Sequence, residues 1–343
     1  MRSMVLISMS SLPFLFSVPV LPSDDAGLVT EMATVRFDWS AAGSGRTAMP
    51  RFSRGMLAIS HLEGNTTTSI SLFSRDGQAA ARIQFEIPDA QRTILSSGGI
   101  APLPDGSGYV AVAVAVNGSR RARPLCFLDA KGKLLKVVPT DPFLPVLITV
   151  AADGTIWAVG ATNSDDVPES DDPVLRRFSG AGELLGTALP RRLFGQEPPQ
   201  SHSPESGVAV LTSTGSRVVF YSPHTRQLFE FGLDGAMIAA HVLPLVLADL
   251  PDKTASKPLT LTGLALMEQG NIYADLSGGR NRGLHELDRA GPRWVPLHPE
   301  DQERFRDYSL LGSDGNQLVL CPIGPRGVTL DVTWIRPTPR FAP

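Results

Sequence analysis

Cysteine is nearly absent from the chain. Its 343 residues include only two cysteines, Cys126 and Cys321, and neither belongs to a Cys-x-x-Cys pair or lies next to a histidine. Two cysteines are too few for a disulfide framework or a cysteine-based zinc site. We therefore predict that both are buried thiols within strands.

A charge excess of either sign is also lacking. The chain carries 31 Lys and Arg against 34 Asp and Glu, a formal net charge of −3. This balance argues against a nucleic-acid-binding protein with a strongly basic surface, and against an acidic disordered tail. Hydrophobic residues make up 42% of the sequence, enough at this length to build a globular core.

Long helical patterns are missing, and turn-forming residues are abundant. The 32 glycines and 29 prolines are spread along the chain. They predict many short elements joined by turns. No window shows a convincing 3.6-residue amphipathic period, so we expect an all-β protein.

The N-terminal segment is uncharged and apolar after Arg2. Residues 4–22 contain no charged side chain, and Asp24 and Asp25 follow directly. This layout predicts a secretory signal peptide over residues 1–25, hence an extracytoplasmic protein, periplasmic or secreted. Pro13 and Pro19 argue against a stable membrane-spanning helix. The alternatives are an uncleaved anchor and a translation start at Met32.

A strand–turn–strand segment recurs five times along the rest of the chain. Its copies close on glycines 77, 132, 182, 235 and 291, which are 55, 50, 53 and 56 residues apart. Between the copies lies a second hairpin, with Asp-Gly or Gly-Asn between apolar runs, as at 148–159 and 263–274. Two hairpins per period of about 53 residues amount to four strands, the content of one propeller blade.

Six such units account for the chain between residues 28 and 337. Full copies cover 99–139, 147–190, 207–244 and 262–297, and a fifth covers 52–87. The sixth begins at 309 and has three strands of its own, while 34–39 is a strand without a blade. We therefore predict one domain, a six-bladed β-propeller of four-stranded antiparallel blades whose ring is closed by the N-terminal strand.

This pattern resembles the six-bladed propellers of the NHL and TolB-like kind. The most similar stretch is Ile148-Thr-Val-Ala-Ala-Asp-Gly-Thr-Ile-Trp-Ala-Val159, followed by Leu175-Arg-Arg-Phe-Ser-Gly-Ala-Gly-Glu-Leu184. The likeness covers residues 34–336 and rests on turn chemistry. It departs from the NHL pattern because the Asn-x-Arg pair before the third strand is lacking.

The turn lengths distinguish the two faces of the expected ring. The glycine turns all fall on one face, and the longer loops fall on the other, where we expect ligands to bind. We select charged and amide residues of three long loops as candidate ligand contacts: Arg120, Arg121, Arg123, Asn163, Asp165, Asp166, Arg280 and Arg282. The acidic loop at 163–172 could supply oxygen ligands to calcium, but it lacks the spacing of a calcium loop. The alternative for all of these loops is ordinary solvated charge.

Catalytic signatures are absent. The sequence contains no Gly-x-Ser-x-Gly, HExxH, P-loop or GxGxxG motif, and none of its six histidines has a metal-binding spacing. His61 and His285 fall within predicted strands. We therefore predict no catalytic residue, no metal ligand and no cofactor.

Two functions remain open. The first is a non-enzymatic, monomeric binding propeller whose partner is a protein, peptide or glycan, without nucleic-acid or membrane partners beyond the export signal. The alternative is a metal-dependent hydrolase or lyase of the lactonase type. The resemblance implies a metal held in the channel by acidic and amide side chains, whereas the predicted inner strands here, such as Leu147-Ile-Thr-Val150, are apolar or small.

Overall fold

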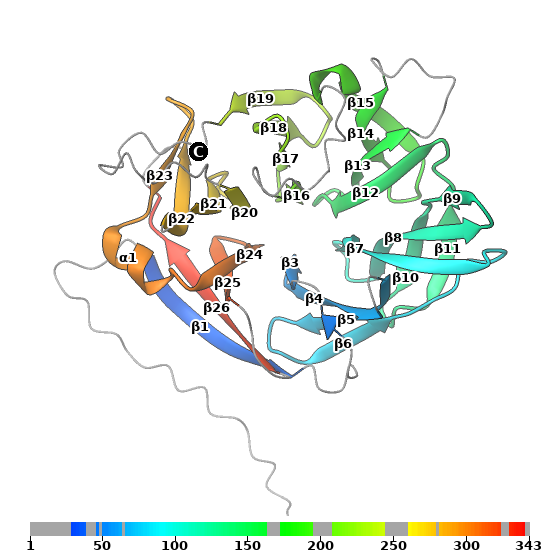
Figure 1. Cartoon of the computed structure of the whole chain (residues 1–343), viewed down its shortest axis with the longest axis horizontal. Coiled ribbons are helices and arrows are strands. Elements are labelled where there is room, and N and C mark those ends of the chain that lie inside the picture. The colour runs from blue at the N-terminus through cyan, green and yellow to red at the C-terminus, as the bar shows by residue number, and fades with distance from the viewer. Residues whose placement is uncertain are drawn as a thin grey trace, which may run out of the picture.

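Antiparallel strands make up almost the whole structure. The computed structural model describes residues 29–38, 46–47, 50–63, 66–162, 172–194, 208–243, 260–278, 281–323 and 329–339. In this part of the chain the strands form five sheets, which Figure 1 shows set around a common centre. One short helix, α1 (Pro299–Arg304), and a 3-10 turn (Arg191–Phe194) accompany them. The prediction of an all-β chain with four-stranded antiparallel sheets is confirmed.

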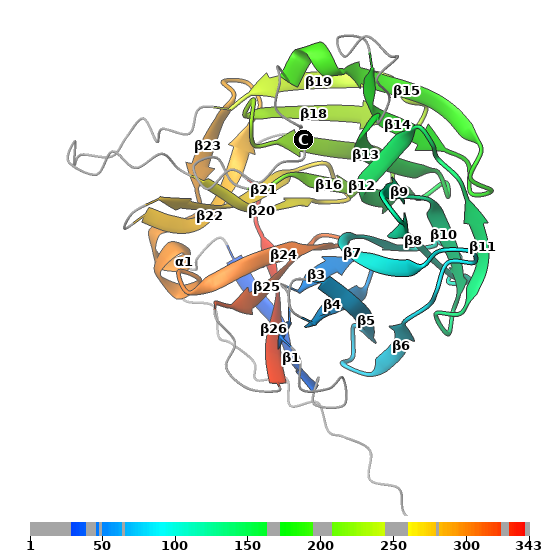
Figure 2. The same cartoon turned by 45° about the vertical axis from the view of Figure 1, so that its right-hand side comes forward.

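Three of the sheets have the same simple topology, in which each strand pairs with the next strand along the chain. Their innermost strands are β12, β16 and β20. Figure 2 shows the sheet of β16 to β19 with its strands side by side. The strands are β12 (Phe143–Val150), β13 (Ile156–Thr162), β14 (Pro173–Phe178), β15 (Leu184–Pro190), β16 (Val210–Ser213), β17 (Arg217–Ser222), β18 (Gln227–Gly232), β19 (Met237–Val242), β20 (Thr260–Leu266), β21 (Ile272–Gly278), β22 (Asn281–Asp288) and β23 (Arg293–Pro296).

The largest sheet has ten strands and contains two four-stranded parts joined at one residue pair, Thr67 with Leu95. The start of β7 differs from the sequence prediction, because β7 begins at Arg92, whereas the unit was expected to begin at residue 99. The first part is β3 (Arg51–Ser53), β4 (Met56–Glu63), β5 (Thr66–Ser74) and β6 (Ala79–Ile83), and the second is β7 (Arg92–Pro102), β8 (Gly108–Asn117), β10 (Leu125–Asp129) and β11 (Leu134–Val138). Two short strands are added at the side, β2 (Arg46–Thr47) on β4 and β9 (Arg120–Ala122) on β8.

The remaining sheet joins the two ends of the chain. It is ordered β1 (Val29–Asp38), β26 (Thr329–Pro337), β25 (Gln317–Pro322) and β24 (Tyr308–Asp314). The strand expected at 34–39 is thus part of β1, which pairs antiparallel with β26, with Val35 opposite Val332 and Phe37 opposite Leu330. The N-terminal strand therefore covers what would otherwise be the open outer edge of β26.

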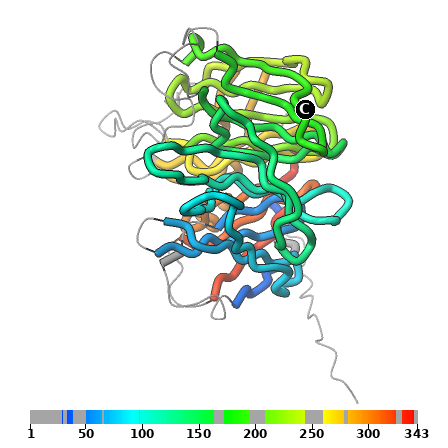
Figure 3. The backbone as a smooth tube through the Cα atoms, turned by 90° about the vertical axis from the view of Figure 1, so that its right-hand side faces the viewer, coloured from blue at the N-terminus to red at the C-terminus, as the bar shows by residue number. Residues whose placement is uncertain are grey.

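Neighbouring sheets pack face to face through apolar side chains. In β17, Val219 and Tyr221 join the cluster shared with β20 to β23, whereas Val218 and Phe220 join the cluster shared with β12 to β15. Because successive side chains of a strand point to opposite faces, such a strand must be apolar throughout to bury both. Figure 3 shows the sheets formed by residues 92–190, in cyan to green, from the side.

The recurring glycine turn is built in the same way at four of its five copies. Gly77, Gly132, Gly182 and Gly235 have φ between 82° and 95°, and the N–H of each donates to the carbonyl three residues earlier at 2.8 to 3.0 Å. A side chain would be strained at these φ values, which explains the recurrence of glycine. Gly291 does not share this positive φ, so the fifth copy of the motif closes through a different turn.

Both cysteines are buried, free thiols in strands, as predicted: Cys126 in β10 and Cys321 in β25. Burial raises the pKa of each thiol to about 12.

An aromatic cluster connects β1 to the neighbouring sheet. Phe37 is fully buried, and its ring lies edge-on to Phe73 at 5.9 Å and beside Trp334 at 6.3 Å. Phe52 of β3 meets Trp334 from another side at 5.8 Å. The first described strand is thus fixed by side-chain packing as well as by its hydrogen bonds to β26.

We predict that Phe37→Ala lowers the free energy of unfolding by about 3 to 5 kcal/mol, because it removes the ring and leaves a cavity. Urea unfolding followed by tryptophan fluorescence measures the change. Arg36→Ala on the exposed face of β1 is the matched control and should change stability far less, since its ion pair with Asp331 lies at the surface. Equal effects of the two substitutions would contradict a structural role for the Phe37 cluster.

Candidate functional site

A cavity of about 250 Å³ lies at the centre of the face that carries the short turns. Five sheets contribute to it through the turn that follows their innermost strand. The lining residues are Arg54, Ala152, Ser213, Thr214, Gly215, Glu268, Ser313, Asp314 and Gly315. In Figure 1 the innermost strands β3, β7, β12, β16, β20 and β24 surround the centre, so we call this cavity the axial cavity.

The axial cavity contains charges of both signs. Burial lowers the pKa of Arg54, and the nearby carboxylates of Asp153 and Glu268 act in the opposite direction. Within the described part of the chain, neither carboxylate forms an ion pair with Arg54 at 4 Å or less. Arg54 and Glu268 line the cavity and Asp153 is close enough to act on Arg54, but none of these charges is neutralised by direct contact between them.

Two buried polar atoms at the axial cavity have no hydrogen-bond partner: Nε of Arg54 and Oγ1 of Thr214. Arg54 also has a positive φ of 45°, followed by Gly55 at 73°, in the two-residue turn between β3 and β4. A non-glycine residue in this region of φ is uncommon. A polar ligand in the axial cavity could satisfy both atoms, which would otherwise cost stability.

Asp314, by contrast, is held by the protein itself. It accepts from Nη1 of Arg75 at 2.9 Å and from Nε1 of Trp334 at 3.2 Å, and the Arg75 guanidinium lies 5.6 Å from the centre of the Trp334 ring. Arg75 comes from the neighbouring sheet. These contacts fix one wall of the axial cavity and link two sheets.

A further guanidinium lies deeper in the interior, on β3. Arg51 is exposed to solvent, yet the surrounding strands lower its pKa by desolvation. Its Nη1 would lie only 3.3 Å from a Cβ placed on Gly98 of β7, so the side chain extends from β3 toward a neighbouring innermost strand. No charged or hydrogen-bonding partner of Arg51 occurs among the residues that the structure describes.

The sequence pattern did not indicate Arg51 and Arg54, because the candidate residues were chosen from the long loops of the opposite face. Arg54-Gly55 before the apolar run 56–59 is the signal that could have indicated a hairpin. The positive φ of Arg54 was not foreseeable, since this conformation favours glycine.

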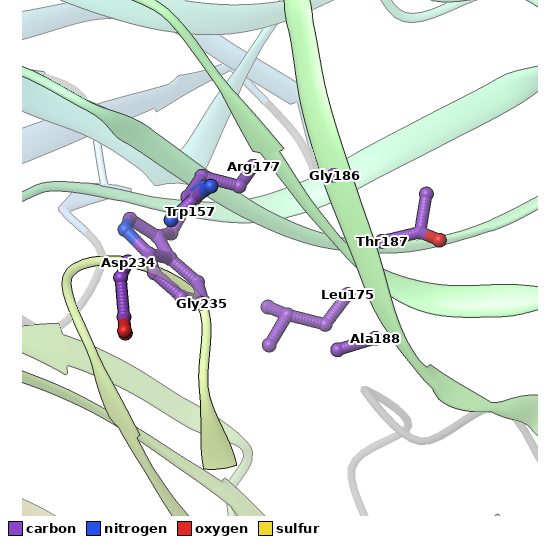
Figure 4. Close-up of a pocket in the computed structure, with 8 residues that line it drawn as sticks. All are labelled: Trp157, Leu175, Arg177, Gly186, Thr187, Ala188, Asp234 and Gly235. Carbon is purple, nitrogen blue, oxygen red and sulfur yellow. The ribbon is translucent and has the colours of Figure 1, made fainter.

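A second pocket, of about 140 Å³, lies between the sheet of β12 to β15 and the turn at Asp234 and Gly235 (Figure 4). Arg177 beside it donates from Nη1 to the carbonyl of Leu233 at 2.6 Å, and Trp157 lies next to its guanidinium. Figure 4 shows the Asp234 side chain pointing away from Arg177. Arg177 thus connects two sheets through a backbone carbonyl.

The next pair of sheets makes the corresponding contact with an ion-pair network. Glu230 of β18 is buried and accepts from Arg289 of the neighbouring sheet at 2.8 and 2.9 Å and from His241 at 3.1 Å. Burial acts to raise the pKa of Glu230, but the hydrogen bonds and charges of Arg289 and His241 outweigh it, and the pKa is lowered. We interpret this network as structural because every member has a protein partner.

The structure describes four of the eight predicted site residues. Arg120 and Arg121 are exposed but lie in strand β9 rather than in a loop, which corrects the prediction. Arg123 is half-buried, and its pKa is lowered by burial and by the neighbouring charge of Arg121. The fourth is Arg282. The other four, Asn163, Asp165, Asp166 and Arg280, lie outside the described residues.

Arg282 also differs from the prediction, because it lies in β22 and is not a free loop charge. Its Nη2 donates to Oδ2 of Asp275 at 2.9 Å and to Oγ of Ser309, in the neighbouring sheet, at 2.9 Å. Burial raises the pKa of Asp275, opposed by the charge of Arg282. The structure therefore does not bring Arg282 together with Arg120, Arg121 and Arg123 through any described contact.

Within the described ranges, no three His, Cys, Asp or Glu side chains are grouped as metal ligands. No helix in these ranges is both long and apolar enough to span a bilayer.

His61 and His285 lie in strands, as predicted, and both are buried. Nε2 of His61 is 2.9 Å from Oγ of Ser71, and Nδ1 of His285 is 2.9 Å from the carbonyl oxygen of Gly283. Desolvation lowers the pKa of His285 to about 4.

No protein-family model matches the chain, and no curated protein matches its sequence. Among solved structures, a candidate exported protein from Bacteroides fragilis is 11% identical, with a TM-score of 0.59 over 91% of this chain and 97% of its own. The β-propeller domain of the trilobed protease from Pyrococcus furiosus is 12% identical, with a TM-score of 0.45 over 86% and 95%. A gluconolactonase from Xanthomonas campestris is 16% identical, with a TM-score of 0.42 over 90% and 88%.

At 11% identity, the likeness to the Bacteroides protein concerns the fold alone. Four-stranded antiparallel sheets that pack face to face around one centre are the defining feature of β-propellers. The fold therefore places this chain in the β-propeller class.

The pKa of His285 leads to a prediction on stability and pH. Below its ordinary pKa of 6.5 the unfolded chain binds a proton at this histidine, whereas the folded chain does so only near pH 4. The free energy of unfolding should therefore fall by about 2 kcal/mol between pH 7.5 and pH 5 through this residue. His285→Asn, which keeps a donor but does not titrate, should lose that part of the pH dependence.

Urea unfolding at both pH values measures this difference, and His224→Asn at an exposed turn is the control that should retain the full dependence. The same pH slope in His285→Asn and in the unsubstituted protein would contradict the prediction.

Proposed function

We propose that the chain is a six-bladed β-propeller of the NHL or TolB-like kind, with its ring closed by β1. The two parts of the ten-stranded sheet count as two blades and the other sheets as four. Six hydrophobic clusters within the described residues support this arrangement, because each one joins two neighbouring blades. The pairing of β1 with β26 supports the closure.

The proposed function is non-enzymatic binding of a small polar ligand in the axial cavity. The observation that carries this proposal is the pair of buried atoms without partners, Nε of Arg54 and Oγ1 of Thr214, on the wall of a cavity of about 250 Å³. Sites for small molecules are concave and contain a few polar groups in fixed positions. The turns of five sheets supply such a wall on a rigid scaffold.

We place the protein outside the cytoplasm as a monomer. The apolar segment at 4–22 supports export, and the structurally similar Bacteroides protein is also described as a candidate exported protein. The ligand then comes from the periplasm or the external medium.

The alternative, a metal-dependent hydrolase or lyase, makes a different prediction about composition. It requires one calcium or zinc per chain in the purified protein, whereas the binding function requires none. Elemental analysis distinguishes the two, and a stoichiometric metal would favour the enzyme.

A tryptophan in the axial cavity should block binding. Ala152 is exposed at the cavity, so Ala152→Trp fills it from a turn position. We expect a panel of amino acids, short peptides and oligosaccharides to contain a class that raises the melting temperature by a few degrees at saturation. Scanning fluorimetry should show that Ala152→Trp abolishes this rise.

Ala130→Trp is the matched control, because Ala130 is an exposed alanine in the turn between β10 and β11, away from the axial cavity. It should retain the full rise. Stabilisation that survives Ala152→Trp but is lost in Arg121→Met would move the binding site to the long-loop face and overturn the axial site.

A further inference from the structure

Arg51 carries a positive charge that has no protein counterpart among the residues that the structure describes. It lies on β3, three residues before Arg54 in the chain, and its guanidinium reaches Gly98 of β7. The absence of a side chain at Gly98 leaves space that Leu147 and the guanidinium share, since a Cβ there would be 2.7 Å from Cδ2 of Leu147 and 3.3 Å from Nη1 of Arg51. Of the other innermost strands, β12, β16 and β20 contain no charged residue, whereas β7 begins with Arg92 and β24 ends with Asp314.

The opening of the axial cavity has the opposite balance. Asp153 and Glu268 both act on Arg54, so two carboxylates accompany one guanidinium there. Glu268 and Asp153 are exposed, whereas Asp314 is already paired with Arg75. A ligand that enters from this face therefore meets negative charge first and positive charge farther in.

The separation along β3 sets the length of such a ligand. Three residues of strand correspond to about 10 Å. An extended peptide spans this distance with about three residues. A guanidinium binds a carboxylate strongly, because both the hydrogen-bond donor and the acceptor are charged.

We propose that the axial site binds the free carboxyl end of a short peptide, with the terminal carboxylate on Arg51 and the amino-terminal side between Glu268 and Asp153. This inference rests on the proposed binding function and names its ligand class. Arg54 Nε and Thr214 Oγ1 are then available to the peptide backbone between the two ends. The direction in which the peptide chain lies in the site follows from the order of these charges along the axis.

Three probes separate the parts of the proposal: triglycine, N-acetyl-triglycine and triglycine amide. Isothermal titration calorimetry on the full chain should show the tightest binding for triglycine. Triglycine amide should bind at least about tenfold more weakly, because it lacks the carboxylate that Arg51 recognises. N-acetyl-triglycine should lose a smaller factor, because its amino end no longer attracts Glu268 and Asp153.

Arg51→Met keeps an unbranched apolar stem and removes the charged guanidinium. We expect this substitution to weaken the affinity for triglycine at least about tenfold, so that the variant binds triglycine and its amide equally. Its melting temperature should not fall, since Arg51 has no partner in the described part of the protein. Glu268→Gln should reduce the difference between triglycine and its N-acetyl form, and the exposed-site control Arg121→Met should change none of these values.

Equal affinities for triglycine and its amide in the unsubstituted protein would overturn the proposal, as would the absence of triglycine binding at millimolar concentration. In either case the binding function still stands if another class in the panel is blocked by Ala152→Trp. If no class is blocked by Ala152→Trp, the binding function at the axial cavity falls as well.

Discussion

Face-to-face packing of neighbouring sheets is the constraint on which the structure depends. A sheet between two others has no solvent-facing side, so its middle strands must be apolar at every position. β17, with Val218 and Phe220 toward one neighbour and Val219 and Tyr221 toward the other, meets this requirement. Among the described residues, Glu230 enters such an interface with a partner, Arg289. The aromatic contact of Phe37 with Trp334 applies the same rule where the two ends of the chain meet.

The same constraint explains why the centre is available for function. Interfaces between sheets are packed mainly with apolar side chains, whereas the innermost strands have only the edge of each sheet to present toward the centre. Side chains there are not required to be apolar, and a charge can persist without a protein partner if solvent or a ligand reaches it. Arg51 is such a residue: exposed, desolvated in part by its surroundings, and unpaired in the described chain. Arg54, in the turn that follows β3, is likewise not required to be apolar.

The regular part of the fold could be predicted from the sequence, because turn glycines and apolar runs carry local signals. The turns at Gly77, Gly132, Gly182 and Gly235 have the positive φ that the repeat indicated. The extent of β7 and the strand β9 were not predictable, because they depend on pairing with β8 and not on local propensity. Helix α1 was missed for a different reason: six residues after the N-cap His298 are too few to show a period. The axial cavity could not be predicted either, since its lining residues lie far apart in the chain.

Some residues that depart from the repeat are explained by the packing of the sheets, and others are not. The interface position occupied by Phe127, Arg177, Glu230 and Glu286 in successive sheets varies widely in chemistry, yet each described case has a protein partner that accounts for it. Arg51 and Arg54 have none, and they belong to the shortest innermost strand, where three residues suffice for pairing with β4. A strand that contributes so little to the sheet is free to carry residues that the fold does not need. The two arginines of β3 and its turn are therefore better explained by a ligand than by the stability of the ring.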